Sequence, residues 1–331
     1  MAEISASAPH EVGVVVIGRN EGERLRRCLD SLVDGAQRVV YVDSGSTDGS
    51  VVMAQGKGVE VVALDMGVPF TAARARNAGF TRLQALAPQI RYVQFVDGDC
   101  ELFDDWIDAA RQFLQEHPDV ACVCGRLRER YPERSVYQRL CDFEWDRPAG
   151  EADACGGIAM MRAEVFTSVG GFREDLIAGE EPELCLRMRA AGARIWRIPN
   201  AMAWHDAAMH KFSQWWWRAL RGGYVVAEGA ALYGAHPLAH YRRPLMRIIV
   251  WGIAIPLATG LLSLADPRWL ALAAVYPLQV VRLAWRGTAS PAMNWITGFF
   301  YTLVKIPEGL GVCKYWINRA CRRRGRLIEY K

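Results

Sequence analysis

The sequence predicts an α/β protein with a mostly parallel sheet that carries helices on both faces, followed by membrane-associated helices near the C-terminus. In the first part of the chain, apolar runs rich in β-formers alternate with amphipathic stretches. The second expectation depends on 248–265, eighteen residues without a charge, which is about the minimum for a membrane span. Apolar residues make up 51% of the 331 residues, so a large core is expected and global disorder is not.

The expected elements alternate in a fixed order. Strands are expected at 12–17, 38–42, 59–64, 91–96 and 119–124. Helices are expected where apolar residues recur at helical spacing, at 25–33, 50–56, 70–86 and 106–114. Because each strand is followed by a helical stretch, the strands should run parallel and end at one edge of the sheet.

Polar side chains cluster where these strands end. Asn20 and Glu21 follow the first strand, Asp43 ends the second, and Asp97 and Asp99 follow the fourth. Ligands of open α/β sheets bind at this edge. No glycine-rich phosphate loop accompanies them, because the turn after the first strand is GRNEG and the motif GxxxxGK[ST] is absent. A phosphate-bearing ligand is therefore expected to be held through a metal ion.

The motif Asp97-Gly98-Asp99 is the candidate for that metal site. The two aspartates are two residues apart, and the glycine permits a tight turn, so both carboxylates can converge on one point. Carboxylate oxygens favour Mg²⁺ or Mn²⁺, and a bound cation relieves the repulsion between them. The alternative is a solvated turn, because Asp-Gly is a common turn dipeptide.

Charge and cysteine usage restrict the class of protein. The net charge of +4 argues against a nucleic-acid protein, although the basic tail RACRRRGR at 319–326 could meet anionic lipid or RNA, or stay solvated. The nine cysteines show neither a C-x-x-C pair nor zinc spacing, so reduced thiols that pack in the core of a cytosolic domain are expected. The N-terminus lacks the apolar region of a secretory signal.

Five segments carry a family resemblance. They are VVVIGRNEG (14–22), VVYVDSGSTDGS (39–50), FTAARARNAG (70–79), FVDGDC (95–100) and ACGGIAMMRAEVFTSVGGFREDLIAGEEPELCLRMRAAG (154–192). In this order, across roughly residues 11–220, the sequence resembles inverting glycosyltransferases of family 2 with the GT-A fold, of the bacterial membrane-associated surface-polysaccharide type.

The resemblance implies a nucleotide-sugar site at the sheet edge. Asn20 and Glu21 would line its nucleotide end, and Asp43 would contact the uracil or ribose. Many family members have a second aspartate at the next position, where this chain has Ser44. Arg76 would face the nucleotide or its diphosphate.

The same resemblance assigns the cation and the catalytic base. Asp97 and Asp99 form the D-x-D motif for Mg²⁺ or Mn²⁺, Asp97 also facing the ribose or a metal-bound water, and His205 is a further candidate ligand or a structural histidine. Glu181 stands where the family usually places its aspartate base, and Glu180 precedes it. Glu183 stays an alternative, and all three acids could instead complement the positive end of a helix.

Two domains are expected. Residues 1–235 would form the GT-A domain, and 236–331 a membrane-associated region with a hairpin at 248–285, an interfacial helix at 292–313 and the basic tail. Basic residues flank both arms of the hairpin at one end, which places the catalytic domain on the cytoplasmic side of the cell (inner) membrane. A partly inserted hairpin and a buried helical subdomain are the alternatives.

The expected activity is transfer of a sugar from a nucleotide-sugar, expected to be a UDP-sugar, to a lipid-linked sugar or saccharide acceptor in polysaccharide or glycoconjugate biosynthesis. Membrane lipids are expected as further partners. One alternative is a polyprenyl-phosphate sugar synthase, in which a lipid phosphate is the nucleophile and a base matters little. Another is a catalytically inactive GT-A domain that binds carbohydrate or assists assembly.

Overall fold

The computed structural model describes residues 11–33 and 38–322, and the chain divides into two compact units. Unit 1 comprises Met1–Tyr131 and Asp142–Ala207, and unit 2 comprises Pro132–Cys141 and Ala208–Lys331. Each unit is described separately below.

Unit 1 contains a nine-stranded sheet in its described residues. Its strands are β1 (Val12–Gly18), β2 (Arg38–Asp43), β3 (Glu60–Ala63), β4 (Tyr92–Asp97), β5 (Cys100–Leu102), β6 (Val120–Glu129), β7 (Gly150–Glu151), β8 (Ala159–Arg162) and β9 (Arg194–His205). Its helices are α1 (Glu23–Val33), α2 (Ser50–Gly56), α3 (Ala72–Leu86), α4 (Trp106–Glu116), α6 (Ala163–Ser168) and α7 (Glu180–Ala190). Helix α5 (Val136–Trp145) is divided between the two units.

The strand order β3-β2-β1-β4-β8-β6-β9-β5, with β7 on β9, confirms the α/β class and corrects its detail. The strands β3, β2, β1 and β4 are parallel, as predicted. Beyond β4 the sheet is mixed, because β8 is antiparallel to both β4 and β6, and β5 is antiparallel to β9. The predicted alternation of strands and helices fails after β4, because β5 is only three residues long and follows β4 through a tight turn without an intervening helix.

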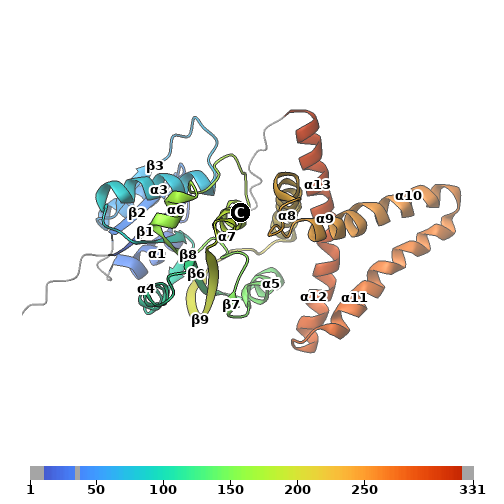
Figure 1. The fold of residues 1–331 in the computed structure, drawn as a ribbon. Coiled ribbons are helices and arrows are strands. Elements are labelled where there is room, and N and C mark those ends of the chain that lie inside the picture. Colours follow the sequence, from blue (N-terminus) through green and yellow to red (C-terminus); the bar gives the residue numbers. More distant parts are fainter. Residues whose placement is uncertain (1–10, 34–37, 323–331) are drawn as a thin grey trace, which may run out of the picture. The chain divides into compact units, whose positions relative to one another are not determined.

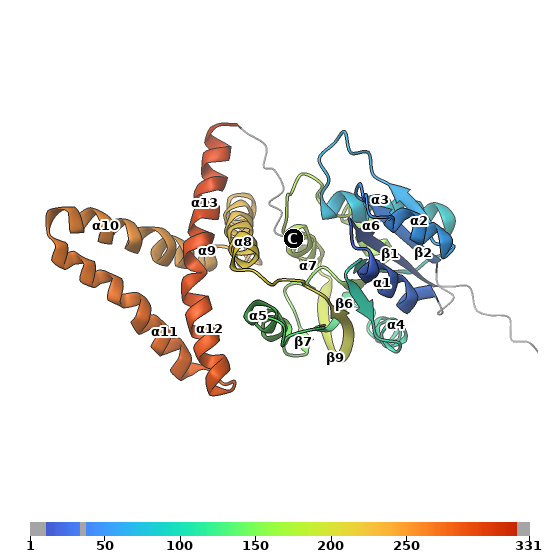
Figure 2. The same ribbon diagram turned by 180° about the vertical axis from the view of Figure 1, so that it is seen from behind.

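The core of unit 1 explains why the first strands form. The strand β1 is central, and its residues Val14, Val15 and Val16 are fully buried. Figures 1 and 2 show α3 and α6 on one face of this part of the sheet and α1 and α2 on the other. Gly79 of α3 permits the close packing, since a Cβ atom at this position would overlap the Val15 side chain. The parallel register then brings the carboxyl ends of β1, β2 and β4 to one edge.

Unit 2 is helical. Its helices beyond α5 are α8 (Phe212–Tyr233), α9 (Arg242–Ile249), a π-helical segment (Val250–Ala254), α10 (Ile255–Ala265), a 3₁₀ segment (Pro267–Ala274), α11 (Val275–Arg286), α12 (Pro291–Leu303) and α13 (Lys305–Ala320). The helices α8 and α13 approach so closely that a Cβ atom at Gly223 would overlap the Glu308 backbone, and one at Gly311 would overlap the Leu220 carbonyl. Such glycine contacts let helix backbones meet.

The segments predicted to meet the membrane are helical in unit 2. Within the described residues, Arg242–Ala265 is the one helix whose length and composition would suffice to cross a membrane. In its most apolar stretch of 18 residues, only 11% is buried inside the protein. Figure 1 shows α10 and α11 as the two arms of a hairpin. The stretch 292–313 forms parts of two helices rather than one, because Pro307 suits the first turn of a new helix and cannot donate to Leu303. The basic tail beyond residue 322 lies outside the described residues.

Candidate active site

The first two strand ends are joined by hydrogen bonds between their loops. Asn20, which has a positive φ of 55°, donates its backbone N–H to Ser46 Oγ at 2.9 Å. Its side-chain Oδ1 accepts the Thr47 N–H at 2.7 Å. Glu21, also predicted at the nucleotide end, forms an ion pair with Arg24 of α1 at 2.6 Å. These contacts fix the shape of the loops at the edge where a nucleotide is expected.

Asp43 is buried at the end of β2 and holds the following loop. Its Oδ1 accepts the Tyr41 hydroxyl at 2.9 Å, and its Oδ2 accepts the N–H groups of Gly45 and Ser46, each at 2.9 Å. Burial raises the pKa of Tyr41 well above its usual range, so the phenol stays a hydrogen-bond donor at neutral pH. The structure therefore gives Asp43 a positioning task that the sequence did not indicate.

Arg76, Asp97 and Glu180, here called the Arg76 group, meet near the end of β4. The Arg76 guanidinium donates to Asp97 Oδ1 at 2.8 Å and to Glu180 Oε1 at 2.6 Å, and its side chain is only 4% exposed. Burial alone lowers the pKa of Arg76, but the two carboxylates outweigh it and raise the pKa above its usual range. The arginine thus remains charged and compensates both acids.

Asp99, Cys100 and His205, here called the Asp99 group, meet where β5 begins and β9 ends. His205 Nε2 is 3.2 Å from Asp99 Oδ2, and the donor atoms of the group all lie within 4.8 Å of one another. The ring of Trp145 meets the imidazole edge-on at 4.6 Å. The buried His205 Nδ1 has no hydrogen-bond partner within the described residues. A carboxylate beside an imidazole is a donor set that suits a divalent cation such as Mn²⁺.

The two aspartates of the D-x-D motif have different partners in this structure, which the spacing of the motif did not indicate. Asp97 continues the register of β4 and faces Arg76, whereas Asp99 precedes β5 and faces His205. The cause is the pairing of Cys100 with His205 in the antiparallel β5–β9 ladder, which turns the chain at Gly98. Asp99 and His205 are therefore brought together, and Asp97 joins the Arg76 group instead.

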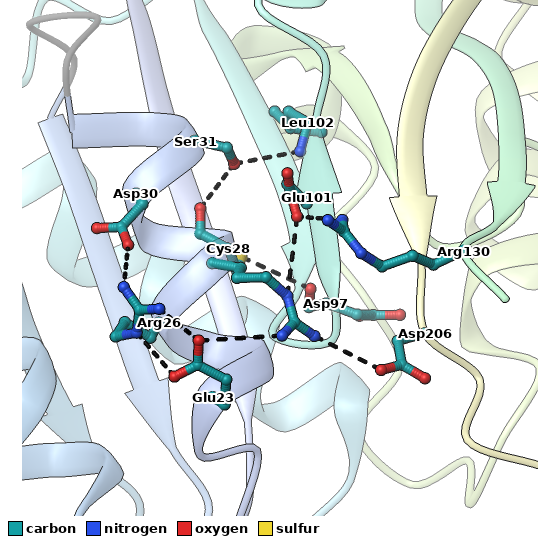
Figure 3. Close-up of polar contacts among 11 residues, drawn as sticks. Glu23, Arg26, Cys28, Asp30, Ser31, Asp97, Glu101, Leu102, Arg130 and Asp206 are labelled. Carbon is teal, nitrogen blue, oxygen red and sulfur yellow. Dashed lines mark hydrogen bonds and ion pairs between the residues drawn. The ribbon is translucent and has the colours of Figure 1, made fainter.

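Ion pairs beside this turn are shown in Figure 3. Glu101 of β5 pairs with Arg130, and Arg27 of α1 lies 3.9 Å from Glu101 and 3.5 Å from Asp206. The Cys28 thiol lies 3.8 Å from the Asp97 carbonyl oxygen, within reach of a weak sulfur hydrogen bond. These contacts anchor both sides of the turn that carries Asp99.

The three acids at the start of α7 have separate environments. Glu180 belongs to the Arg76 group, with its side chain 13% exposed. Glu181 is buried, and its Oε1 accepts the Cys155 N–H and lies 3.2 Å from Cys185 Sγ. Glu183 is buried in a two-pronged ion pair with Arg187 at 2.9 and 2.7 Å, which gives it a structural role.

The glycine loop before β8 connects these environments. Gly157 has a φ of 88°, and a Cβ atom there would lie 3.5 Å from Arg76 and 3.9 Å from Asp97. Two residues earlier, the backbone N–H of Cys155 holds Glu181. The loop thus runs from the candidate base to the Arg76 group.

Sequence reasoning missed several residues of this site. Tyr41 and Ser46 organise the carboxylate of Asp43, and Cys155 and Cys185 surround that of Glu181. Cys185 follows Glu181 by four residues, and this spacing on a predicted helix could have indicated the contact. Cys155 carries no comparable signal, because only the tertiary fold brings it to α7.

Comparisons with known proteins place the sequence among glycosyltransferases. Residues 13–170 match the model of glycosyl transferase family 2. The chain is 26% identical to a pre-mycofactocin glycosyltransferase of Mycobacterium tuberculosis over 96% of this chain and 70% of that protein. It is 27% identical to the succinoglycan biosynthesis protein ExoA of Rhizobium meliloti over 76% of each chain.

A solved structure supports the fold along nearly the whole chain. A mannosyltransferase from Pyrobaculum calidifontis, determined with GDP-mannose and Mn²⁺, is similar with a TM-score of 0.59. The alignment covers 94% of this chain and 90% of that one at 18% identity. Together with the sheet topology, these findings show that residues 13–170 form a glycosyl transferase family 2 domain and that the chain has the GT-A fold.

Proposed function

We propose that the protein transfers a sugar from a nucleotide-sugar to a hydroxyl group of a lipid-linked or saccharide acceptor, with inversion at the anomeric carbon. The observation that carries the proposal is that Arg76 joins Asp97 at the end of β4 to Glu180 of α7, while Asp99, two residues after Asp97, lies beside His205. The donor is proposed to be a UDP-sugar, with its nucleotide at the joined loops of Asn20 and Asp43.

The residues present fit a divalent cation. Asp99 and His205 would hold it, because they offer a carboxylate and an imidazole nitrogen, Nε2, side by side. When bound, Mg²⁺ or Mn²⁺ acts as a Lewis acid that stabilises the departing diphosphate. The relative from Pyrobaculum calidifontis was determined with Mn²⁺, which supports the same class of ion here.

Glu181 is proposed as the base that takes the proton from the acceptor hydroxyl. The Cys155 N–H fixes one of its oxygens, so the carboxylate has a defined orientation at the first turn of α7. Glu180 suits this role less well, because its charge is already compensated by Arg76 at 2.6 Å. Arg76 is a positioning residue that holds Glu180 and Asp97 at the end of β4.

Membrane attachment through unit 2 is part of the proposal, and it would bring the enzyme to a lipid-linked acceptor at the cytoplasmic face of the cell membrane. The apolar helix Arg242–Ala265 supports it, as do leucines with high exposed fractions on α10, among them Leu261 at 67% and Leu264 at 84%. ExoA carries out succinoglycan biosynthesis by its name, which fits a role in polysaccharide or glycoconjugate assembly.

The test is an assay of purified full-length protein against a panel of UDP- and GDP-sugars with a membrane lipid extract as acceptor source. We expect transfer from at least one donor in Mn²⁺ or Mg²⁺ and loss of that transfer in chelator. Absence of metal-dependent transfer and of nucleotide-sugar hydrolysis across the panel would instead indicate an inactive carbohydrate-binding domain. Transfer that survives Glu181→Gln unchanged would favour a lipid-phosphate nucleophile.

A further inference from the structure

Three cysteines from distant parts of unit 1 meet in its core. Cys122 lies on β6, Cys155 lies between β7 and β8, and Cys185 lies on α7. The Cys185 Sγ is 3.7 Å from the Cys155 Sγ, and the Cys122 thiol interacts with both of the others. Each residue is at most 2% exposed. These three residues are called the thiol cluster below.

The carboxylate of Glu181 completes the cluster. Its Oε1 lies 3.2 Å from the Cys185 Sγ, and the donor atoms of Cys155, Glu181 and Cys185 all lie within 4.8 Å of one another. Glu181 and Cys185 share one face of α7 because they are four residues apart. Two thiols and a carboxylate therefore face a common point inside the protein.

These separations match the edges of a zinc coordination tetrahedron. With Zn–S bonds of about 2.3 Å and Zn–O bonds of about 2.0 Å, two sulfur ligands are about 3.8 Å apart, and a sulfur and an oxygen ligand are about 3.5 Å apart. The observed separations are 3.7 Å for Cys155–Cys185 and 3.2 Å for Cys185–Glu181. Two of the three ligand–ligand separations thus already have nearly tetrahedral lengths, and the third lies within 4.8 Å.

We propose that Cys155, Glu181 and Cys185 form a binding site for a thiophilic divalent cation, Zn²⁺ or Cd²⁺, with Cys122 as a candidate for a further sulfur ligand. The site differs in composition from the Asp99 group, since it offers two thiols and a carboxylate, whereas the Asp99 group offers one thiol beside a carboxylate and an imidazole. A second thiolate increases the preference for soft cations. Binding forms metal–sulfur bonds and releases the thiol protons to solvent, with no change in oxidation state.

The site has a consequence for catalysis that rests on the proposed function. A cation bound at the thiol cluster would engage the carboxylate of Glu181, which is the proposed base. Thiophilic cations should therefore inhibit sugar transfer even when Mn²⁺ is saturating, and inhibition should follow occupancy of the thiol cluster. The geometry thus separates a supporting cation at the Asp99 group from an inhibitory cation at the thiol cluster.

The experiment uses the full-length protein, reduced with a phosphine and freed of metal. Titration with Cd²⁺ is followed through sulfur-to-cadmium charge-transfer absorption in the ultraviolet, and Zn²⁺ is tested as a competitor. We expect one tightly bound Cd²⁺ per chain. Wild-type protein that shows no tight cadmium–thiolate absorption would overturn the proposal without recourse to any variant.

Variants then locate the site. Cys185→Ser and Cys155→Ser should each weaken Cd²⁺ binding by about 100-fold or more, since even supporting residues around metal sites change affinity by about 10- to 100-fold. Cys124→Ser is the matched control, because Cys124 is fully buried on the same strand as Cys122 but outside the cluster. Equal Cd²⁺ affinity in Cys185→Ser and wild type, or equal loss in Cys124→Ser, would contradict the assignment.

A further variant separates this inference from the proposed function. Asp99→Asn should lose Mn²⁺-dependent nucleotide binding and keep the cadmium–thiolate absorption. If the wild type binds Cd²⁺ as expected but transfers no sugar from any donor, the proposed function fails and the thiophilic site stands. If sugar transfer occurs and the wild type forms no cadmium–thiolate bond, the proposed thiophilic site is refuted and the proposed function stands.

Discussion

Replacement of Arg76 by methionine should destabilise unit 1 strongly, because it removes the charge that compensates two acids. The Arg76 side chain is 4% exposed and pairs with Asp97 at 2.8 Å and Glu180 at 2.6 Å. Methionine keeps a similar length and apolar stem while leaving Glu180, 13% exposed, without its partner. Asp97 is 36% exposed, so water can take over part of the compensation of its charge.

The expected loss follows from these burials. Removing one partner of a buried ion pair costs about 3–5 kcal/mol, and the partial exposure of Asp97 favours the lower end, about 3 kcal/mol. With a urea m-value of about 2 kcal/mol/M, the unfolding midpoint should fall by about 1.5 M. Arg82→Met on the same helix is the control, because the Arg82–Glu60 pair is 44% and 35% exposed and contributes about 0–1 kcal/mol.

Amide hydrogen exchange of peptides from β1 and β4 in increasing urea reports on unit 1 alone. Arg76→Met should open these strands at clearly lower urea than Arg82→Met, which should stay within about 0.5 M of wild type. Equal midpoints for the two variants would refute the view that Arg76 is the buried counter-charge of this edge.

Other predictions follow from the remaining parts of the structure. Asp99→Asn should raise the Mn²⁺ concentration for half-maximal transfer by at least about 10-fold, measured by metal titration of activity. Tyr41→Phe should cost about 1–3 kcal/mol by hydrogen exchange of β2 because it removes a donor to a buried carboxylate. Tyr92→Phe is its control and should cost nothing, since the buried Tyr92 hydroxyl lacks a partner in the described residues. Leu261→Glu on exposed α10 should lower the affinity for liposomes, measured by co-sedimentation, by about 100-fold, because a charged side chain costs about 3 kcal/mol in the bilayer. Val52→Glu, at a similarly exposed position in unit 1, should leave liposome binding unchanged.

The fold was largely predictable from periodicity. Long buried strands such as β1 and β4 carry continuous apolar runs, and the helices between them show helical spacing, so their order and parallel pairing followed directly. The short strand β5 and the antiparallel strand β8 were not predictable, because three or four residues carry too little pattern to distinguish a strand from a loop.

The candidate site was predictable in composition and less so in geometry. Sequence reasoning named Asp97, Asp99 and His205 as one metal site, whereas the structure places Asp97 on Arg76. The separation arises from the register between β5 and β9, which no local spacing reports. The thiol cluster was missed for the same reason, since its cysteines are distant in sequence and share no metal-binding spacing.

The central claim is that a carboxylate of α7 deprotonates the acceptor while a cation at the Asp99 group supports the leaving diphosphate. The most direct measurement compares single-turnover transfer and donor affinity in Glu181→Gln with those of wild type. Loss of a general base typically costs about 10²- to 10⁴-fold in rate, and we expect that loss with donor affinity unchanged. A transfer rate for Glu181→Gln within a few-fold of wild type would contradict the account.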